Sequence, residues 1–290
     1  MSDVPPLRPA ATVVVLRPAA AGAGVEVLMV RRHRDIAFMG GAYVFPGGRL
    51  DTGDAVDAPA ARAGIDGLEH VGRCRDLGRD EEAAYRVAAI RELLEEAGVL
   101  LARRGGALVD GVEAARLRAL TPGEAGFAAF ASAQGLRLAL DAVMPFAHWV
   151  TPPVEIRRFD TRFLLARLPA GQVASHDEGE TTALEWMRPD EAVARAQRGD
   201  ILLPPPTWTT LRRMARFASV DDAWQWATTT PIVRIEPGFS RADGATTLML
   251  PGDPTYPLPD GLEPLAETRF VLEDGAWRPV QGSDPIQDGA

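Results

Sequence analysis

The segment 91–99, R-E-L-L-E-E-A-G-V, constrains the fold of this 290-residue chain more than any other part of the sequence. In an α-helix, Glu92, Glu95 and Glu96 fall within an arc of about 100°. The opposite face carries four apolar residues, Val87, Ile90, Leu94 and Ala97. One face can therefore enter a core while the other gathers three negative charges, which repel one another unless a divalent cation binds them.

A solvated charged face is the alternative interpretation of this segment, and the sequence upstream favours the functional one. Phe45-Pro46-Gly47-Gly48 ends an apolar run, and two adjacent glycines let the backbone approach a ligand closely. An acidic loop then leads to Asp54. Gly98 stands where the end of a helix needs a positive φ, and an apolar, strand-like run follows it.

The order of glycine pair, acidic loop and R-E-L-x-E-E-x-G with a following apolar residue resembles the Nudix box of the Nudix hydrolases. That box reads G-x5-E-x7-R-E-U-x-E-E-x-G-U, where U is aliphatic. Gly48 matches its first glycine, and the segment 91–99 matches every defined position of its second half. Asp54, a shorter acid, stands at the place of the first glutamate.

The spacing departs from this pattern. Gly48 and Arg91 lie 43 positions apart instead of 14, so about 29 extra residues are inserted within 55–83. Counted back from Arg91, the place of the first glutamate falls on Ala83. That glutamate is therefore either replaced by Asp54 or lost.

A split box preceded by F-P-G-G-x-L-D occurs in the Nudix branch that includes the animal peroxisomal enzymes cleaving coenzyme A and its thioesters. The chain carries this motif at 45–51. Further likeness to the branch lies at W-V-T-P (149–152), R-F-D-T-R-F (158–163) and P-P-P-T (204–207). The resemblance covers about residues 10–215, and it implies a hydrolase that attacks a diphosphate with the help of a divalent metal.

We expect the α/β/α sandwich with a mixed sheet that this resemblance implies. Apolar or alternating runs predict strands at 11–16, 25–31, 42–45, 161–168 and 182–187. Helices are predicted at 80–97 with Asp80 as N-cap, and at 121–133, 189–198 and 207–217. The Nudix domain would span 8–218 with an insertion inside its box. Residues 219–290 would form a turn-rich C-terminal extension packed on the core, with short strands at 232–235, 247–250 and 269–272.

The roles of the three glutamates follow from the charge of the diphosphate substrate that the resemblance implies. A diphosphate is strongly anionic, so water attacks it only when cations neutralise its oxygens. We expect Glu95 and Glu96 to bind Mg²⁺ or Mn²⁺, and Glu92 to be a third ligand or the base that deprotonates water. Arg91 is expected to act in catalysis by orienting one of these glutamates.

Further ligands are expected from the loops. The backbone carbonyl of Gly47 or Gly48 is a candidate metal ligand beside the helix. An additional acid is expected from the acid-rich segment before the strand at 182–187, with Glu178 and Glu180 as candidates. A solvated hairpin tip is the alternative interpretation of that segment.

All 31 basic residues of the Lys/Arg class are arginines, so any phosphate held by a cationic side chain here is held by arginine. We expect Arg32, Arg158 and Arg162 to bind substrate together with the backbone of Gly47. Surface ion pairs are the alternative for these arginines. Aromatic residues nearby, Trp149, Phe159 and Trp186, are expected to lie in the core rather than to stack on a base.

Composition sets limits on partners and location. The net charge of −9 argues against broad binding to nucleic acid or to an anionic membrane. No apolar run approaches the 18 residues of a membrane span. Cys74 is the one cysteine, which fits a reducing compartment, and we expect no catalytic role for it. The prediction is a cytoplasmic protein, with a homodimer left open.

The resulting hypothesis is a metal-dependent diphosphatase that splits coenzyme A or acyl-coenzyme A into 3′,5′-ADP and 4′-phosphopantetheine derivatives. Other small nucleoside diphosphate derivatives, such as ADP-ribose or NADH, are the alternative substrates. A non-catalytic, nucleotide-sensing Nudix domain is the alternative of another class. The presence of all three helical carboxylates disfavours such a sensor.

Overall fold

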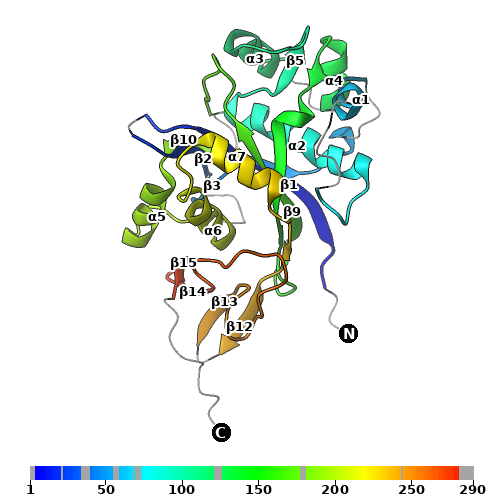
Figure 1. The fold of residues 1–290 in the computed structure, drawn as a ribbon. Coiled ribbons are helices and arrows are strands. Elements are labelled where there is room, and N and C mark those ends of the chain that lie inside the picture. Colours follow the sequence, from blue (N-terminus) through cyan, green and yellow to red (C-terminus); the bar gives the residue numbers. More distant parts are fainter. Residues whose placement is uncertain are drawn as a thin grey trace.

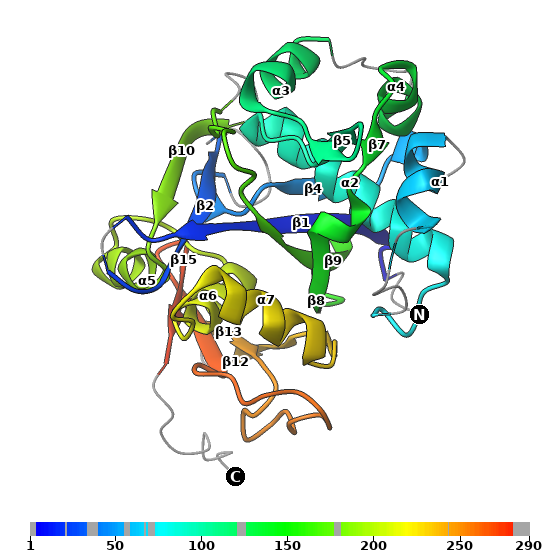
Figure 2. The same cartoon turned by 45° about the horizontal axis from the view of Figure 1, so that its top comes forward.

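A mixed sheet separates two layers of helices (Figures 1 and 2). The computed structural model describes residues 4–20, 22–33, 40–54, 59–66, 68, 73–120, 126–176, 181–242 and 244–280. The main sheet has the order β10 (Thr181–Met187), β2 (Val25–Arg32), β1 (Leu7–Pro18), β9 (Arg158–Arg167), β8 (Val143–Val150), β11 (Arg234–Ile235). Two short strands, β3 (Tyr43–Val44) and β4 (Gly47–Arg49), pair with β2 and β1. β1 runs parallel to β9 and antiparallel to β2, which makes the sheet mixed.

The first layer covers one face of the sheet and contains α2 (Arg79–Ala97), which carries the three glutamates. Around it lie α1 (Pro59–Asp66), α3 (Gly111–Arg118), α4 (Phe127–Ala133) and the 3₁₀ turns η1 (Thr52–Asp54) and η2 (Leu140–Ala142). A small sheet in the order β6 (Ala107–Leu108), β5 (Ala102–Arg104), β7 (Arg137–Leu138) completes this layer.

The second layer covers the other face with α5 (Pro189–Arg198), α6 (Pro205–Met214) and α7 (Val220–Thr229). A four-stranded sheet follows in the order β12 (Gly238–Ala242), β13 (Ala245–Met249), β14 (Arg269–Glu273), β15 (Ala276–Pro279). The predicted α/β/α sandwich with a mixed sheet is therefore confirmed.

Alternation along the central strand explains why the sheet has a core on each face. In β1, Val13 and Val15 pack in the core under α2, whereas Val14 and Leu16 pack in the core under α6 and α7. Successive side chains of a strand point to opposite faces, so a continuous apolar run is what a strand covered on both sides requires.

The helix of the predicted box forms, with corrections at its first turn. It begins at Arg79, and its N-cap is Gly78 rather than the predicted Asp80. The Gly78 amide donates to Glu81 Oε2 at 2.7 Å, so a carboxylate from inside the helix satisfies the cap. At the other end Gly98 has φ 66°, the left-handed conformation predicted for it.

Other differences from the prediction have local causes. β8 was not predicted, because Pro145 and a bulge between Pro145 and Ala147 interrupt its pattern. Helix α7 was not predicted, because its segment was treated as turn-rich. The Ser219 side chain caps this helix by accepting a hydrogen bond from the Asp222 amide. Helix α6 begins two residues earlier than predicted, because proline is favourable in a first turn. Residues 121–125 of the predicted helix at 121–133 lie outside the described residues, and α4 covers its second half.

Described residues after 219 contribute to the core of the second layer. β11 pairs with β8 at the edge of the main sheet. Leu248, Leu250 and Phe270 are buried in the same core as the helices of that layer. Within the described residues, no helix combines the length and the apolarity needed to cross a membrane.

We predict that Phe270→Ala destabilises the whole chain in a single transition. The Phe270 side chain is 0% exposed and its ring meets Trp208 edge-on, with centroids 6.1 Å apart. Removing it leaves a cavity, which costs about 3–5 kcal/mol of unfolding free energy. Denaturant titration followed by circular dichroism and by tryptophan fluorescence measures this loss.

Leu272→Ala is the matched control, because Leu272 lies two residues further along the same strand and is 38% exposed. Its unfolding free energy should change by no more than about 0.5 kcal/mol. A separate early transition for Phe270→Ala, with the main transition unmoved, would contradict the shared core.

Candidate functional site

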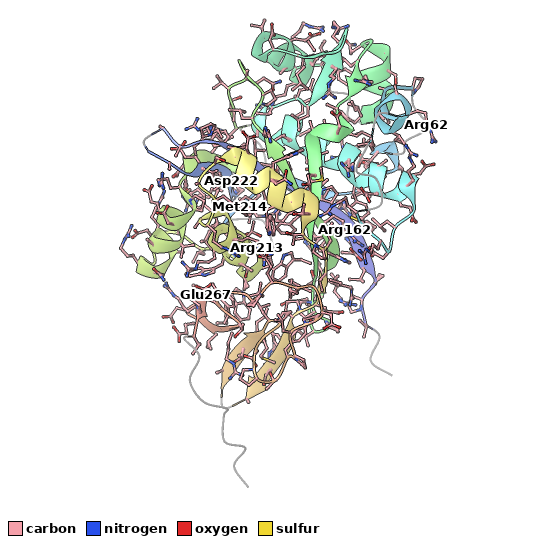
Figure 3. All side chains as sticks on the ribbon, viewed as in Figure 1. Arg62, Arg162, Arg213, Met214, Asp222 and Glu267 are labelled. Atoms are coloured by element: carbon pink, nitrogen blue, oxygen red, sulfur yellow. The ribbon has the colours of Figure 1, made fainter. Side chains whose placement is uncertain are left out.

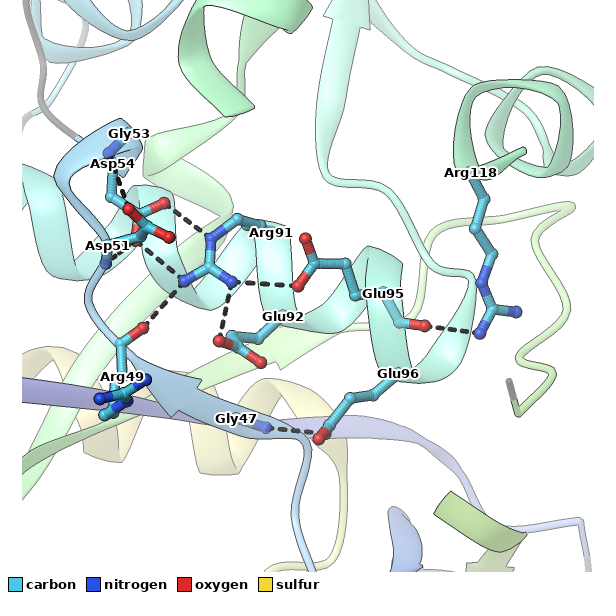
Figure 4. A network of polar contacts seen from close by, with 10 residues as sticks. All are labelled: Gly47, Arg49, Asp51, Gly53, Asp54, Arg91, Glu92, Glu95, Glu96 and Arg118. Atoms are coloured by element: carbon cyan, nitrogen blue, oxygen red, sulfur yellow. Dashed lines mark hydrogen bonds and ion pairs between the residues drawn. The ribbon is translucent and has the colours of Figure 1, made fainter. Parts of the chain in front are cut away.

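A cleft opens where β4 passes the polar side of α2 (Figure 4). Residues Leu16–Pro18 of β1 pair with β2, whereas Ala10–Thr12 pair with β4. β2 and β4 thus share one edge of β1 and separate from each other. The cleft has a volume of about 650 Å³, the size of a small-molecule site. Its wall includes all three predicted glutamates together with Arg91, Gly47 and Gly48.

Arg91 connects the loop before the insertion to the helix after it (Figure 4). Its Nε and Nη2 donate to the two carboxylate oxygens of Asp54 at 2.8 and 2.9 Å, and Nη2 also donates to the Arg49 carbonyl at 2.9 Å. Its Nη1 donates to Glu92 Oε1 at 2.8 Å and to Glu95 Oε2 at 3.0 Å. Arg91 therefore orients two of the three glutamates.

The charge of Arg91 is secured by these partners. Burial alone would lower the pKa of the guanidinium, but the hydrogen bonds that it donates to Asp54 and the charge of Glu92 outweigh burial and raise the pKa. Asp54 itself is buried, so the pair is shielded from water. Ala83, the other candidate for the place of the first box glutamate, is buried in the apolar core. Asp54 therefore occupies the position opposite Arg91.

Position 48 requires glycine because the Glu92 carboxylate lies very close to it, not because of its backbone dihedral angles. A Cβ at this position would stand 2.3 Å from Glu92 Oε1. Burial raises the pKa of Glu92 to about 7, against the opposing effect of Arg91. Any side chain at 48 would push this carboxylate out of its place.

Gly47 is constrained on both sides. Its φ is 156°, and a Cβ there would stand 2.3 Å from the Ala11 carbonyl oxygen. Its amide donates to Glu96 Oε2 at 3.0 Å. The backbone of the glycine pair thus touches both Glu92 and Glu96, and the segment predicted to approach a ligand lies against the acidic face of α2.

The donor set has the chemistry that Mg²⁺ or Mn²⁺ selects, namely carboxylate and carbonyl oxygens. Among the described residues, however, no three His, Cys, Asp or Glu side chains converge as a ready-made metal cluster. The contacts explain why, since Arg91 holds Glu92 and Glu95 and the Gly47 amide holds Glu96. The charge and type of these groups fit a divalent cation, and Glu92, Glu95 and Glu96 are the residues that would hold it.

Comparison with known proteins identifies the family. A family model described as the NUDT19 Nudix domain matches residues 73–214. The chain is 31% identical to the acyl-coenzyme A diphosphatase NUDT19 of Homo sapiens over 295 residues, which covers 87% of this chain and 78% of the human protein. The chain belongs to the Nudix hydrolases. As a Nudix hydrolase it is an enzyme that acts on a diphosphate.

Two further comparisons agree. The NUDT19 protein of Gallus gallus is 30% identical over 276 residues, covering 80% of this chain and 73% of that protein. The crystal structure of a Nudix hydrolase from Alicyclobacillus acidocaldarius superposes with a TM-score of 0.61 and 29% identity, covering 76% of this chain and 96% of that one. The likeness extends to the fold as well as to the box.

Besides Arg91, three further arginines line the cleft of this Nudix hydrolase, namely Arg32, Arg49 and Arg157. Arg32 was predicted as a substrate residue, and Arg157 belongs to the same basic cluster as the predicted Arg158 and Arg162, whereas Arg49 was not predicted. Within the part of the chain that the structure describes, no carboxylate forms an ion pair with any of the three, and the buried Nε of Arg32 has no hydrogen-bond partner. These guanidiniums are available to an anion in the cleft.

The structure places Arg158 and Arg162 elsewhere, which corrects their predicted role. Arg158 is buried, donates to the Thr151 carbonyl at 3.0 Å and pairs with Glu236 at 2.7 Å. Arg162 binds both carboxylate oxygens of Asp76 at 2.9 and 2.6 Å. Figure 3 shows where Arg162 lies on the ribbon. Neither arginine lines the cleft. Both fix the fold instead, and Arg162 ties the box insertion to β9.

The remaining predictions divide between the core and the cleft. Glu178 and Glu180 lie outside the described residues. Trp149 is buried in the core as predicted, but Phe159 also lines the cleft. Burial raises the pKa of the Cys74 thiol to about 12, so it carries no thiolate for catalysis at neutral pH.

We predict that Gly48→Ala lowers kcat for diphosphate hydrolysis at least about 10²-fold, in the range of losing one transition-state contact. The new methyl group displaces the Glu92 carboxylate. Steady-state kinetics measure the loss, and circular dichroism checks the fold. Gly78→Ala at the other end of α2 is the control, because its methyl would meet only the flexible end of Glu81 at 3.3 Å. Equal activity of the two variants would contradict this role of Gly48.

We predict that Asp76→Asn lowers the unfolding free energy by about 1–3 kcal/mol and leaves KM within about twofold. Arg162 is 2% exposed, so its charge loses its carboxylate without gaining water, although Asp76 is 55% exposed and solvent reduces the effect. Thermal unfolding and kinetics on the same preparation measure the two effects. Asp221→Asn, in the exposed pair with Arg167, is the control and should change little. A raised KM of Asp76→Asn, with unchanged unfolding free energy, would show instead that Arg162 acts in substrate binding.

Proposed function

We propose that this Nudix hydrolase is a metal-dependent diphosphatase that splits coenzyme A or acyl-coenzyme A into 3′,5′-ADP and 4′-phosphopantetheine derivatives. The observation that carries the proposal is the acidic face of α2, held by Arg91 against the backbone of Gly47 and Gly48. The printed names of the human and chicken relatives, acyl-coenzyme A diphosphatases, support the choice of substrate.

The reaction breaks one P–O bond of the bridging oxygen between the two phosphorus atoms. Water attacks one phosphorus, the bridging oxygen leaves with the other phosphate, and the proton of the water passes to a base. A bound Mg²⁺ or Mn²⁺ would neutralise the phosphate oxygens as charge builds up on the leaving group.

Glu95 and Glu96 are the proposed metal ligands, and Glu92 is a third ligand or the base that takes the proton. Arg91 lies in the cleft wall, but its donors are bonded to Asp54, Glu92, Glu95 and the Arg49 carbonyl, so its proposed role is to keep two glutamates in place while the substrate changes charge. The three arginines at the cleft wall offer countercharge that does not depend on the metal.

The substrate must bring more than two phosphates to use this wall fully. Coenzyme A carries a 3′-phosphate on its ribose in addition to the diphosphate, whereas ADP-ribose and NADH carry the diphosphate alone. Arg32, Arg49 and Arg157 provide three cationic groups around an acidic centre. This surplus of guanidinium groups favours coenzyme A over the alternative nucleoside diphosphate derivatives.

A substrate panel tests the proposal. Purified protein is incubated with coenzyme A, acetyl-coenzyme A, ADP-ribose and NADH, with Mg²⁺, with Mn²⁺ or with EDTA, and products are identified by mass. We expect 3′,5′-ADP from the first two substrates and no turnover with EDTA. Faster cleavage of ADP-ribose would overturn the substrate, and failure to cleave any diphosphate would favour a sensor.

We predict that Glu95→Gln lowers kcat at least about 10²-fold without unfolding the protein, because it removes a charge from the metal site. Glu191→Gln is the matched control, since Glu191 is an exposed glutamate in the first turn of α5. Kinetics at saturating Mg²⁺ compare the two variants, and thermal unfolding confirms that both are folded. Near-full activity of Glu95→Gln would remove this residue from the site.

Cytoplasmic location and homodimer formation stay predictions.

A further inference from the structure

A second, apolar pocket joins the acidic cleft. It has a volume of about 200 Å³, below the range of whole ligand sites, so it has room for one end of a ligand. It shares Thr12, Arg32, Gly47, Phe159 and Thr161 with the cleft. A molecule whose diphosphate lies against the glycine pair can therefore reach into it without leaving the protein surface.

The pocket lies in the second layer, and the C-terminal residues complete it. Phe45, Trp149 and the proline block 204–206 are among the apolar residues of its wall that precede residue 219, and Arg32 and Glu155 are its charged ones. Leu248 and Trp277 close it from the four-stranded sheet. These two residues lie beyond 214, where the match to the Nudix family model ends. Leu248 is also part of the core of the second layer and Trp277 packs against that core, so the four-stranded sheet holds both residues in the wall of the pocket.

The two ends of an acyl-coenzyme A molecule differ in the wall they need. The adenosine end carries an anionic 3′-phosphate and a base with several hydrogen-bonding groups, which are costly to bury without partners. Arg49 and Arg157 line the acidic cleft and not the apolar pocket. The acyl end needs only apolar surface, which Trp277, Leu248 and the prolines supply.

We propose that this pocket receives the acyl chain of the thioester, and that the C-terminal extension, through Trp277 and Leu248, sets the preferred chain length. The proposal rests on the proposed function, because it assigns one end of that substrate. The extension thereby becomes the part of the enzyme that distinguishes acyl-coenzyme A from free coenzyme A.

A series of straight-chain acyl-coenzyme A substrates, from acetyl to dodecanoyl, tests the assignment in the wild-type protein with Mg²⁺. We expect kcat/KM to rise about fourfold for each added methylene until the pocket is full, and then to level off. This increase in kcat/KM should come from a lower KM at unchanged kcat, because the acyl chain is bound equally before and during the reaction. A flat series beside measurable cleavage of coenzyme A overturns this inference and leaves the proposed function intact. No cleavage of either substrate overturns the proposed function itself.

Two variants assign the effect to the extension. Trp277→Ala opens the wall, so the ratio of kcat/KM for hexanoyl-coenzyme A over free coenzyme A should fall at least about tenfold, the loss of two methylene contacts. Trp224→Ala, a half-buried tryptophan of α7 that lines neither pocket, is the matched control and should keep the wild-type ratio. Circular dichroism verifies that both variants fold.

Val44→Phe keeps the test decisive if Trp277→Ala fails to fold. Val44 is a half-buried residue of β3 that also lines the pocket, so a larger side chain there fills the space instead of opening it. We expect the preferred chain length to shorten. An unchanged length preference in the folded variants overturns the proposal. Weaker competitive inhibition of Trp277→Ala by 3′,5′-ADP, with an unchanged acyl series, also overturns it by placing the adenosine end in the pocket.

Discussion

The Arg91 guanidinium holds the site together, because it spends each of its five N–H donors on a different acceptor atom. Two go to Asp54, one to the Arg49 carbonyl, and one each to Glu92 and Glu95. The planar guanidinium of arginine can bind all five acceptor atoms, whereas the ammonium group of a lysine has three donors and no fixed plane. The loop that carries the glycine pair and the helix that carries the glutamates are thereby locked at one distance.

This lock explains how the box tolerates its insertion. The entropy cost of closing a loop rises only slowly with length, by about 0.6 kcal/mol for each doubling. The added segment therefore weakens the approach of Asp54 to Arg91 little, provided that it packs. The described residues of the segment do pack: α1 adds Ala60, Ala61 and Ile65 to the core of the first layer, and Asp76 pairs with Arg162. The two halves of the box therefore meet in space although the sequence between them is interrupted.

The sequence predicted those features that depend on neighbours along the chain. The acidic face of α2, the left-handed Gly98 and helix α5 from Pro189 to Arg198 all follow from local spacing and capping. It failed where a partner is remote. Nothing near Arg162 shows that Asp76, 86 residues earlier, would take up its charge. Likewise the neighbours of Arg49 do not show that β4 would turn it into the cleft, so the arginines of the wall could not be separated from those of the fold.

Because side chains alternate between the two faces of the sheet, the acidic residues and the apolar pocket lie in different layers. The glutamates and Arg91 belong to the layer of α2, whereas the apolar pocket belongs to the opposite layer with α6 and the C-terminal strands. The cleft joins them beside β4, whose two glycines leave the backbone bare on either side. A change of side chain in the C-terminal strands can therefore reshape the pocket while the carboxylates keep their partners. The two glycines are needed for different reasons, since a side chain at 48 would displace the Glu92 carboxylate and one at 47 would collide with the backbone of β1 at Ala11.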